Sequence, residues 1–245
     1  MLLKTILYRN MDKRQIEHFM ECIRGLVFDG SPELHAETLS LLEGLVGEDK
    51  AKAFMNQMPE IRRLILTDVD AIASNDPAAD DREEIISCYP GVTAMLHYRT
   101  ANRLFRLGVP VLPRFITELA HSATGIDIHP AASIGEYFAI DHGTGIVIGA
   151  TAVIGHHVML YQGVTLGARN FRYDDKGHPL NIPRHPVLED NVTVYSNTSI
   201  LGNVRIGHDT IIGGNVWLTH DVPPHSRIQQ GRAIYVRSFE DGAGI

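Results

Sequence analysis

The feature that most constrains this chain is a six-residue repeat in its second half. Aliphatic residues mark the repeat at Ile128, Ile134, Ile140, Ile148, Ile154, Leu160 and Leu166, and then at Leu188, Val194, Ile200, Ile206, Ile212 and Leu218. Four positions after most of these markers stands a small or β-branched residue, such as Ala132, Val164 or Thr198. A unit of six residues is too short for a helical repeat, but it fits one short strand and a corner. The pattern therefore predicts a triangular coil of parallel strands with about four turns.

The first half of the chain has a different period. From about residue 11 to residue 122 apolar residues recur at helical spacing, as in Ile61, Leu64 and Ile65. Pro59 and Pro90 stand where proline fits the first turn of a helix. The sequence therefore predicts an α+β protein. It has an all-helical domain of about five or six helices over residues 1–124, a β-helix over residues 125–228 and a tail over residues 229–245.

Composition narrows the classes of function. With 44% apolar and 21% charged residues, a chain of 245 residues is expected to fold into a sizeable core. A formal net charge of −7 provides no general attraction for nucleic acid. Cys22 and Cys88 are too few for a disulfide framework, and no run has the apolar length of a signal peptide or a membrane span. We therefore expect a cytoplasmic protein with no membrane or nucleic-acid partner.

The repeat breaks twice, and each break carries a histidine. Two extra residues stand in the segment "DHGTGI", which begins with Asp141 and His142. Sixteen extra residues form an extended loop that ends in Arg184 and His185. Counted along the coil, the two breaks fall at different edges, so the two histidines of one chain should not meet. Prisms packed around a threefold axis would bring different edges of neighbouring chains together, which predicts an active site between subunits.

A histidine beside a carboxylate is suited to general-base chemistry. Neutral imidazole accepts a proton from an alcohol near neutral pH, and a carboxylate on its far nitrogen stabilises the imidazolium. His142 could thus activate an acceptor hydroxyl for direct attack on a thioester, without a protein nucleophile. His185 or backbone amides could then stabilise the developing oxyanion.

Two other interpretations of the repeat stay open at this point. The coil could be an inert spacer or trimerisation rod, because periodicity alone carries no chemistry. It could also hold zinc, on His220 and His225 or on the pair His156 and His157, although no zinc-module spacing accompanies them. We expect no metal.

Several segments together resemble one family. The segments "TGIDIHPAASIG", "DHGTGIVIGATAVIG", "QGVTLG", "RHP", "ILGNVRIG" and "VPPHS" look like those of serine O-acetyltransferases, which are hexapeptide-repeat acyltransferases. Upstream, "NDPAADDREEIISCYPGVTAMLHYR" is similar to the segments that precede the repeat in this family. The resemblance implies a left-handed parallel β-helix with an extended loop. It also implies acetyl transfer from acetyl-CoA to the hydroxyl of L-serine, the first step of cysteine biosynthesis from serine.

The resemblance also implies roles for single residues. His142 is expected to be the general base, Asp127 the carboxylate that orients it, and His185 a group that binds substrate and assists transfer. The positions matched to amino-acid binding are Asp80, with Asp81 as its competitor, Asp141 and Arg184. The positions matched to acetyl-CoA contacts are Gly167, Ala168, Ser196 and Gly214.

The same resemblance implies partners. The chain ends in Ile245, which is expected to enter the active site of O-acetylserine sulfhydrylase. L-Cysteine is expected to inhibit at the serine site, and the assembly is expected to be a homotrimer or a dimer of trimers. Two alternatives remain: an acetyltransferase for a sugar or amino sugar, and a non-catalytic trimeric scaffold that docks the sulfhydrylase.

Overall fold

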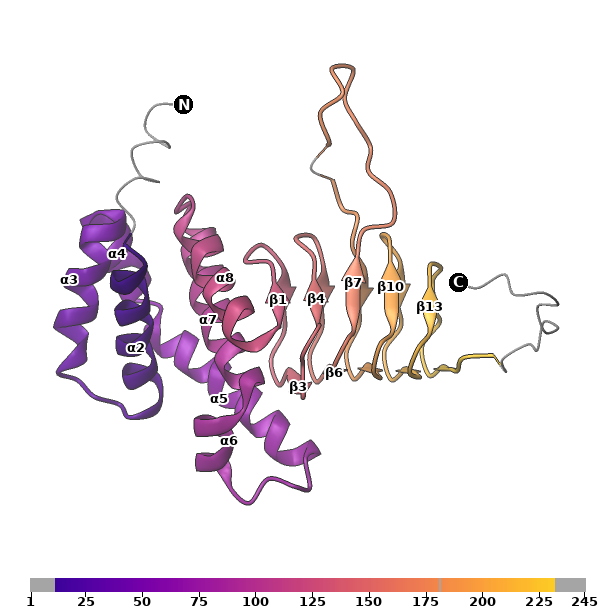
Figure 1. Ribbon diagram of the computed structural model, residues 1–245, viewed down its shortest axis with the longest axis horizontal. Coiled ribbons are helices and arrows are strands. Elements are labelled where there is room, and N and C mark those ends of the chain that lie inside the picture. The colour runs from indigo at the N-terminus through magenta and orange to yellow at the C-terminus, as the bar shows by residue number, and fades with distance from the viewer. Residues whose placement is uncertain (1–11, 181, 232–245) are drawn as a thin grey trace, which may run out of the picture.

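The computed structural model describes residues 12–180 and 182–231 of the chain. Helices gather at one end, and a prism of short strands extends away from them (Figure 1). Seven helices lie in the described residues: α2 (Lys13–Phe28), α3 (Leu34–Val46), α4 (Glu48–Met55), α5 (Met58–Asn75), α6 (Arg82–Cys88), α7 (Pro90–Arg106) and α8 (Leu112–Thr124). This exceeds the expected number because α4 and α6, with 8 and 7 residues, are too short to show a period of their own.

Proline and glycine set several helix ends, as the sequence predicts. Pro59 lies in the first turn of α5 and Pro90 begins α7, where the missing N–H of proline costs no helical hydrogen bond. Helix α8 ends at Gly125, which has a left-handed φ of 72°. Strand β1 begins two residues later, at Asp127.

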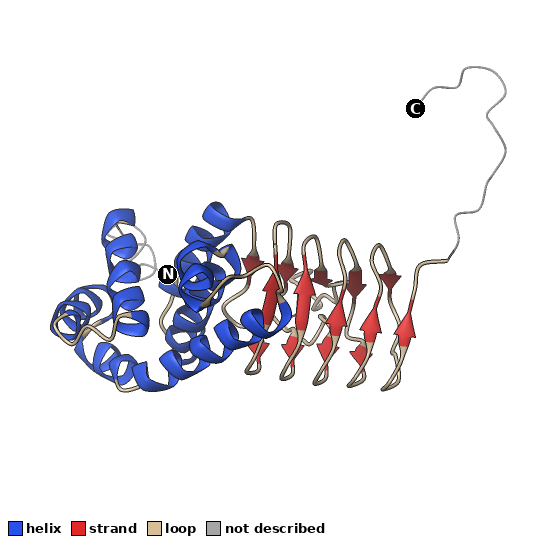
Figure 2. Ribbon diagram, turned by 90° about the horizontal axis from the view of Figure 1, so that it is seen from below, coloured by secondary structure: helices blue, strands red, loops and turns tan. Residues whose placement is uncertain are grey.

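Three parallel sheets form the faces of the prism (Figure 2). Sheet A contains β1 (Asp127–Ile128), β4 (Val147–Ile148), β7 (Thr165–Gly167), β10 (Ser199–Leu201) and β13 (Trp217–Leu218). Sheet B contains β2 (Ser133–Ile134), β5 (Val153–Ile154), β8 (Val187–Leu188) and β11 (Arg205–Ile206). Sheet C contains β3 (Ala139–Asp141), β6 (Met159–Tyr161), β9 (Thr193–Val194), β12 (Ile211–Ile212) and β14 (Arg227–Ile228).

The hexad markers are the inward-facing residues of these strands. All thirteen of them, from Ile128 to Leu218, are buried, and the register stacks marker on marker, as in Ile140 beside Leu160. The predicted parallel β-helix is therefore confirmed. It has about five coils rather than four, because β14 lies beyond the last hexad and its residue Ile228 follows Leu218 by more than six positions.

The helices are joined to the first coil by buried polar contacts. The Arg99 guanidinium forms a bidentate ion pair with Asp68, at 2.9 and 3.0 Å, and donates to the carbonyl of Ile134 at 2.7 Å. The Tyr98 hydroxyl donates to the carbonyl of Ala132 at 2.8 Å. One continuous apolar core also runs from the helices into the coil. These contacts hold α5 and α7 against the first coil.

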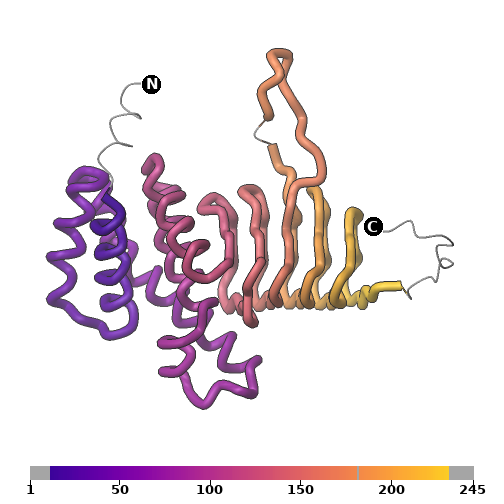
Figure 3. The backbone as a smooth tube through the Cα atoms, viewed as in Figure 1, coloured from indigo at the N-terminus to yellow at the C-terminus, as the bar shows by residue number. Residues whose placement is uncertain are grey.

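The extended loop stands out from the prism after β7, as the tube in Figure 3 makes plain. None of the described helices is both long and apolar enough to cross a membrane. The expectation for Ile245 concerns a residue outside the described ranges.

Candidate active site

The two-residue break of the repeat is the pair His142 and Gly143. At the corner between sheets C and A, which we call the C–A corner, each regular turn has one left-handed residue, namely Gly163, Asn197 or Asn215, and Gly145 is its counterpart in the turn that carries the break. The break adds His142 and Gly143 before Gly145, with φ values of 57° and 95°. His157 and His225 have the same left-handed conformation at regular corners of the coil, so what distinguishes His142 is its place in the break. The break thus turns His142 outward, with its side chain 77% exposed.

Asp141 is the carboxylate that the structure brings to His142. Its Oδ1 lies 3.6 Å from His142 Nε2. Strand β1 follows directly on α8, and the Asp127 carboxylate accepts a hydrogen bond from Arg114 of that helix, at 3.3 Å. Among the described residues, the polar contact of the Asp127 side chain is with Arg114, and its expected role of orienting His142 stays a prediction.

Asp76, at the C-terminal end of α5, shares a small cleft with Asp141. Its Oδ2 accepts a hydrogen bond from the Tyr89 hydroxyl at 2.7 Å, and its Oδ1 accepts one from the N–H of Ala78 at 2.8 Å. These two bonds, together with the charge of His142, lower the pKa of Asp76. Sequence reasoning missed both Asp76 and Tyr89. The sequence did contain a signal for Asp76. It stands directly before Pro77, and the residue before a proline usually marks the end of a helix, which places Asp76 where α5 ends.

Asp80 and Asp81 lie at the start of α6. The Asp81 carboxylate caps the helix by accepting from the N–H of Glu84 at 2.8 Å, and the Glu84 carboxylate accepts from the N–H of Asp80 at 2.7 Å. The bond from Glu84 to Asp81 is a typical N-cap, and the bond from Asp80 to the Glu84 side chain holds the residue before it. Among the acids of this segment, the structure therefore brings Asp76, and neither Asp80 nor Asp81, into the cleft with Asp141.

Two stacked tyrosines lie next to Asp141. Tyr161 pairs with Asp141 in the register of sheet C, and its ring stacks on Tyr195 with centroids 4.7 Å apart. Burial, followed by the charge of Asp141, raises the pKa of Tyr161. The pair forms an aromatic wall beside the acids.

His185 lies at a different edge, the corner between sheets A and B, which we call the A–B corner. Its residue is only 7% exposed, and its ring packs edge-on against Gly149. Its Nδ1 lies 2.7 Å from the Thr151 hydroxyl. Burial, and then the charges of Arg184 and His129, lower the pKa of His185 to about 4. His142 and His185 of one chain thus occupy different corners, as the sequence predicts.

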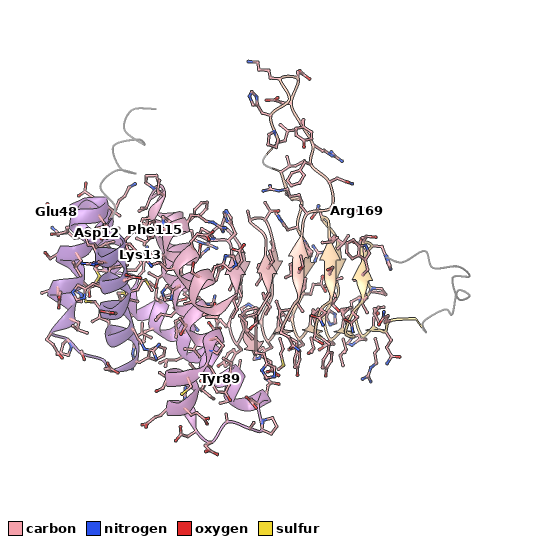
Figure 4. All side chains as sticks on the ribbon, in the orientation of Figure 1. Asp12, Lys13, Glu48, Tyr89, Phe115 and Arg169 are labelled. Atoms are coloured by element: carbon pink, nitrogen blue, oxygen red, sulfur yellow. The ribbon has the colours of Figure 1, made fainter. Side chains whose placement is uncertain are left out.

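Arginines gather near His185. A cavity of about 630 Å³ lies between the root of the extended loop and the last coils, and Arg169, Arg172 and Arg184 line it. In Figure 4, Arg169 is labelled at the root of the loop, on the side of the molecule opposite to Tyr89. Three guanidinium groups around one cavity favour an anionic ligand.

The four residues matched to acetyl-CoA contacts fall into two places. Gly167 is the last residue of β7 and Ala168 follows it, so both lie at the root of the extended loop. Ser196 and Gly214 lie at the C–A corner, on successive coils, and a Cβ on Gly214 would lie 3.2 Å from the Ser196 carbonyl oxygen. Within one chain, only the second pair shares a corner with His142.

Three groups of side chains in the described residues have the spacing of metal ligands. They are His18 with Cys22 and Glu37, Glu118 with His121 and Asp127, and His208 with Asp209 and His225. None includes His142 or His185, and His225 lies with His208 rather than with His220. The pair His156 and His157 belongs to none of these groups.

The chain is similar to known proteins. Residues 185–220 match the family model described as bacterial transferase hexapeptide (six repeats). The plasmid serine acetyltransferase of Synechococcus elongatus is 48% identical over 220 residues, which cover 89% of this chain and 67% of that protein. The serine acetyltransferase of Bacillus subtilis is 37% identical over 166 residues, which cover 68% and 73%.

Solved structures agree with these relatives. Entamoeba histolytica serine acetyltransferase 1 in complex with L-cysteine matches with a TM-score of 0.77 and 34% identity, covering 86% of each chain. Neisseria gonorrhoeae serine acetyltransferase in complex with serine matches with a TM-score of 0.68 and 29% identity, covering 93% of this chain and 85% of that one.

Proposed function

The chain belongs to the serine acetyltransferase family, and from this premise we propose that it transfers an acetyl group from acetyl-CoA to L-serine. The product is O-acetyl-L-serine, and the reaction is the first step of cysteine biosynthesis from serine. The observation that carries the proposal is the placement of Asp76, Asp141 and His142 around one break of the coil.

His142 acts as the general base. Its imidazole takes the proton of the serine hydroxyl while the hydroxyl oxygen attacks the thioester carbonyl carbon. When the carbon–sulfur bond breaks, the imidazolium returns that proton to the departing thiolate, so that free coenzyme A leaves. Asp141, 3.6 Å from His142 Nε2, stabilises the imidazolium in between.

The two acids of the cleft bind the amino group of serine. Asp76 and Asp141 line the same cleft, and two carboxylates suit an ammonium group. Arg184 is suited to the serine carboxylate, because a guanidinium forms a bidentate pair with it. Arg184 and His185 lie at the A–B corner, so in a homotrimer they reach the cleft from a neighbouring chain.

Acetyl-CoA, the co-substrate, lies between the two corners in this proposal. Ser196 and Gly214 contact it near His142, and Gly167 and Ala168 contact it near the loop. The arginine-lined cavity with Arg169 is the candidate for its phosphates. L-Cysteine competes with serine for the same acids, and O-acetylserine sulfhydrylase docks on Ile245. In this proposal the chain assembles into a homotrimer or a dimer of trimers, and it is located in the cytoplasm.

A matched pair of variants tests the amino-acid site. Asp76→Asn should raise the KM for L-serine by about tenfold or more, because a charge-assisted hydrogen bond contributes about 1.5–3 kcal/mol. Asp80→Asn should leave that KM within about twofold, because the Asp80 carboxylate is outside the cleft. Equal effects from the two variants would refute the assignment. A panel of sugars assayed as acceptors should give no turnover in the wild type.

A further inference from the structure

Thr151 lies in the turn from β4 to β5. Among the described residues, both polar contacts of the His185 Nδ1 atom are with Thr151. The Thr151 hydroxyl oxygen accepts hydrogen bonds from the N–H of Arg184, at 3.0 Å, and from the N–H of His185, at 3.2 Å. The same hydroxyl lies 2.7 Å from His185 Nδ1, and the N–H of Thr151 donates to Nδ1 at 3.1 Å.

These contacts determine where the hydroxyl proton points. A hydroxyl has one donor hydrogen and two acceptor lone pairs. Two backbone N–H groups occupy the lone pairs of Thr151, so its hydrogen is directed at His185 Nδ1. That nitrogen then receives two donors, the hydroxyl and the N–H of Thr151. A nitrogen that accepts two hydrogen bonds carries no proton itself, so the ring hydrogen of neutral His185 lies on Nε2.

The surroundings keep this ring neutral and in place. His185 is buried, Arg184 adds positive charge next to it, and His129 lies on the neighbouring coil. Gly149 allows the close approach of the ring, because a Cβ there would lie 2.0 Å from both Cδ2 and Nε2. Among the described residues, none accepts a hydrogen bond from Nε2.

We infer that Thr151 is a positioning residue that fixes His185 as an Nε2–H hydrogen-bond donor to the oxyanion of the acetyl-transfer step. His185 is then a donor only, and His142 is the sole base. Oxyanion stabilisation needs a donor already aimed at the oxygen on which charge develops, and a ring held at Nδ1 by two fixed groups meets that need. The inference rests on the proposed function for its chemistry, but the tautomer can be measured without turnover.

The matched variants are Thr151→Val, which keeps the branched shape and removes the hydroxyl, and Thr151→Ser, which keeps the hydroxyl. Nitrogen NMR of histidine-labelled protein at pH 8 gives the tautomer, with His185→Gln identifying the His185 signals among the thirteen histidines. We expect a protonated Nε2 and an unprotonated Nδ1 in the wild type and in Thr151→Ser. In Thr151→Val we expect a mixture of tautomers.

Serine-dependent turnover gives the second readout. Thr151→Val should lower kcat by about tenfold or more. Removal of an oxyanion donor lowers kcat by about 10²–10³-fold, and a donor that is only misoriented should lower it by less. Thr151→Ser should stay within about threefold of the wild type. Thermal unfolding of each variant checks that the fold is retained.

The outcomes separate this inference from the proposed function. A wild-type ring with its proton on Nδ1, or an unchanged tautomer in Thr151→Val, would overturn the role of Thr151 whatever the activity. A wild type with the expected tautomer but no turnover of L-serine would instead refute the proposed function and the oxyanion role together.

Discussion

Gly149 packs against the Cδ2–Nε2 edge of the His185 ring, and replacing it with alanine adds one methyl group to a position with no space for it. The Cβ of Gly149→Ala would lie 2.0 Å from His185 Cδ2 and Nε2, whereas ordinary contact begins at 3.4 Å. The ring must therefore move by about 1.4 Å, the difference between these distances. Misplacement of a catalytic group by about 1 Å can lower the rate by roughly 10²-fold.

We expect kcat/KM for Gly149→Ala to fall by roughly 10²-fold, which corresponds to about 2.7 kcal/mol of transition-state stabilisation. The added methyl group should also reduce the free energy of unfolding by about 1–3 kcal/mol. The assay is thiol release from acetyl-CoA with L-serine, at a temperature well below the melting transition of the variant.

Gly44→Ala is the matched control, because a Cβ on Gly44, in α3, would meet only Gln15 Nε2 at 3.7 Å. This variant should keep full activity. A folded Gly149→Ala variant with activity within about twofold of the wild type would show that the position of the His185 ring does not matter for transfer, and would refute the reasoning.

Three further predictions concern the C–A corner, the joint between helices and coil, and the acid cleft. Gly143→Ala places a Cβ 2.6 Å from two isoleucine side chains, at a φ of 95°. This variant should lower kcat by about tenfold or more, because the turn that carries His142 must shift. Gly177→Ala is the control: its φ is also positive but its Cβ meets open space in the loop, so its kcat should not change. Arg99→Gln leaves its buried aspartate partner without a counter-charge, so urea unfolding should show a loss of about 3–5 kcal/mol; a loss below about 1 kcal/mol would contradict this. Tyr89→Phe removes the hydrogen bond that contributes most to the low pKa of Asp76, so that pKa should rise, and the loss of serine affinity on acidification should begin at a higher pH than in the wild type. An unchanged pH profile of KM would argue against ammonium binding by Asp76.

The sequence was a good guide to the coil because each hexad buries one residue. A period of six is set by local geometry, so it predicts the inward-facing residues and the two breaks without knowledge of the rest of the fold. It failed at the last coil, where β14 lies outside the hexad spacing, and at the short helices α4 and α6, where 8 and 7 residues cannot show a helical period.

The acids of the site were harder to predict because their roles depend on contacts between distant segments. The segment "NDPAADD" offers three aspartates within six positions. Only the packing of α5 against β3 distinguishes Asp76, in the cleft, from Asp80 and Asp81, at the start of α6. Similarly, the Asp127 carboxylate accepts a hydrogen bond from Arg114 of α8, and nothing in the repeat itself indicates that contact.

Serine-dependent thiol release by His142→Ala, compared with the wild type, tests the central claim most directly. Loss of a general base typically costs about 10²–10⁴-fold in rate. We predict turnover of L-serine by the wild type and a fall of this size in the variant, with an unchanged melting temperature. Equal rates of serine acetylation by the two proteins would contradict the assignment of His142 as the base at the break of the coil.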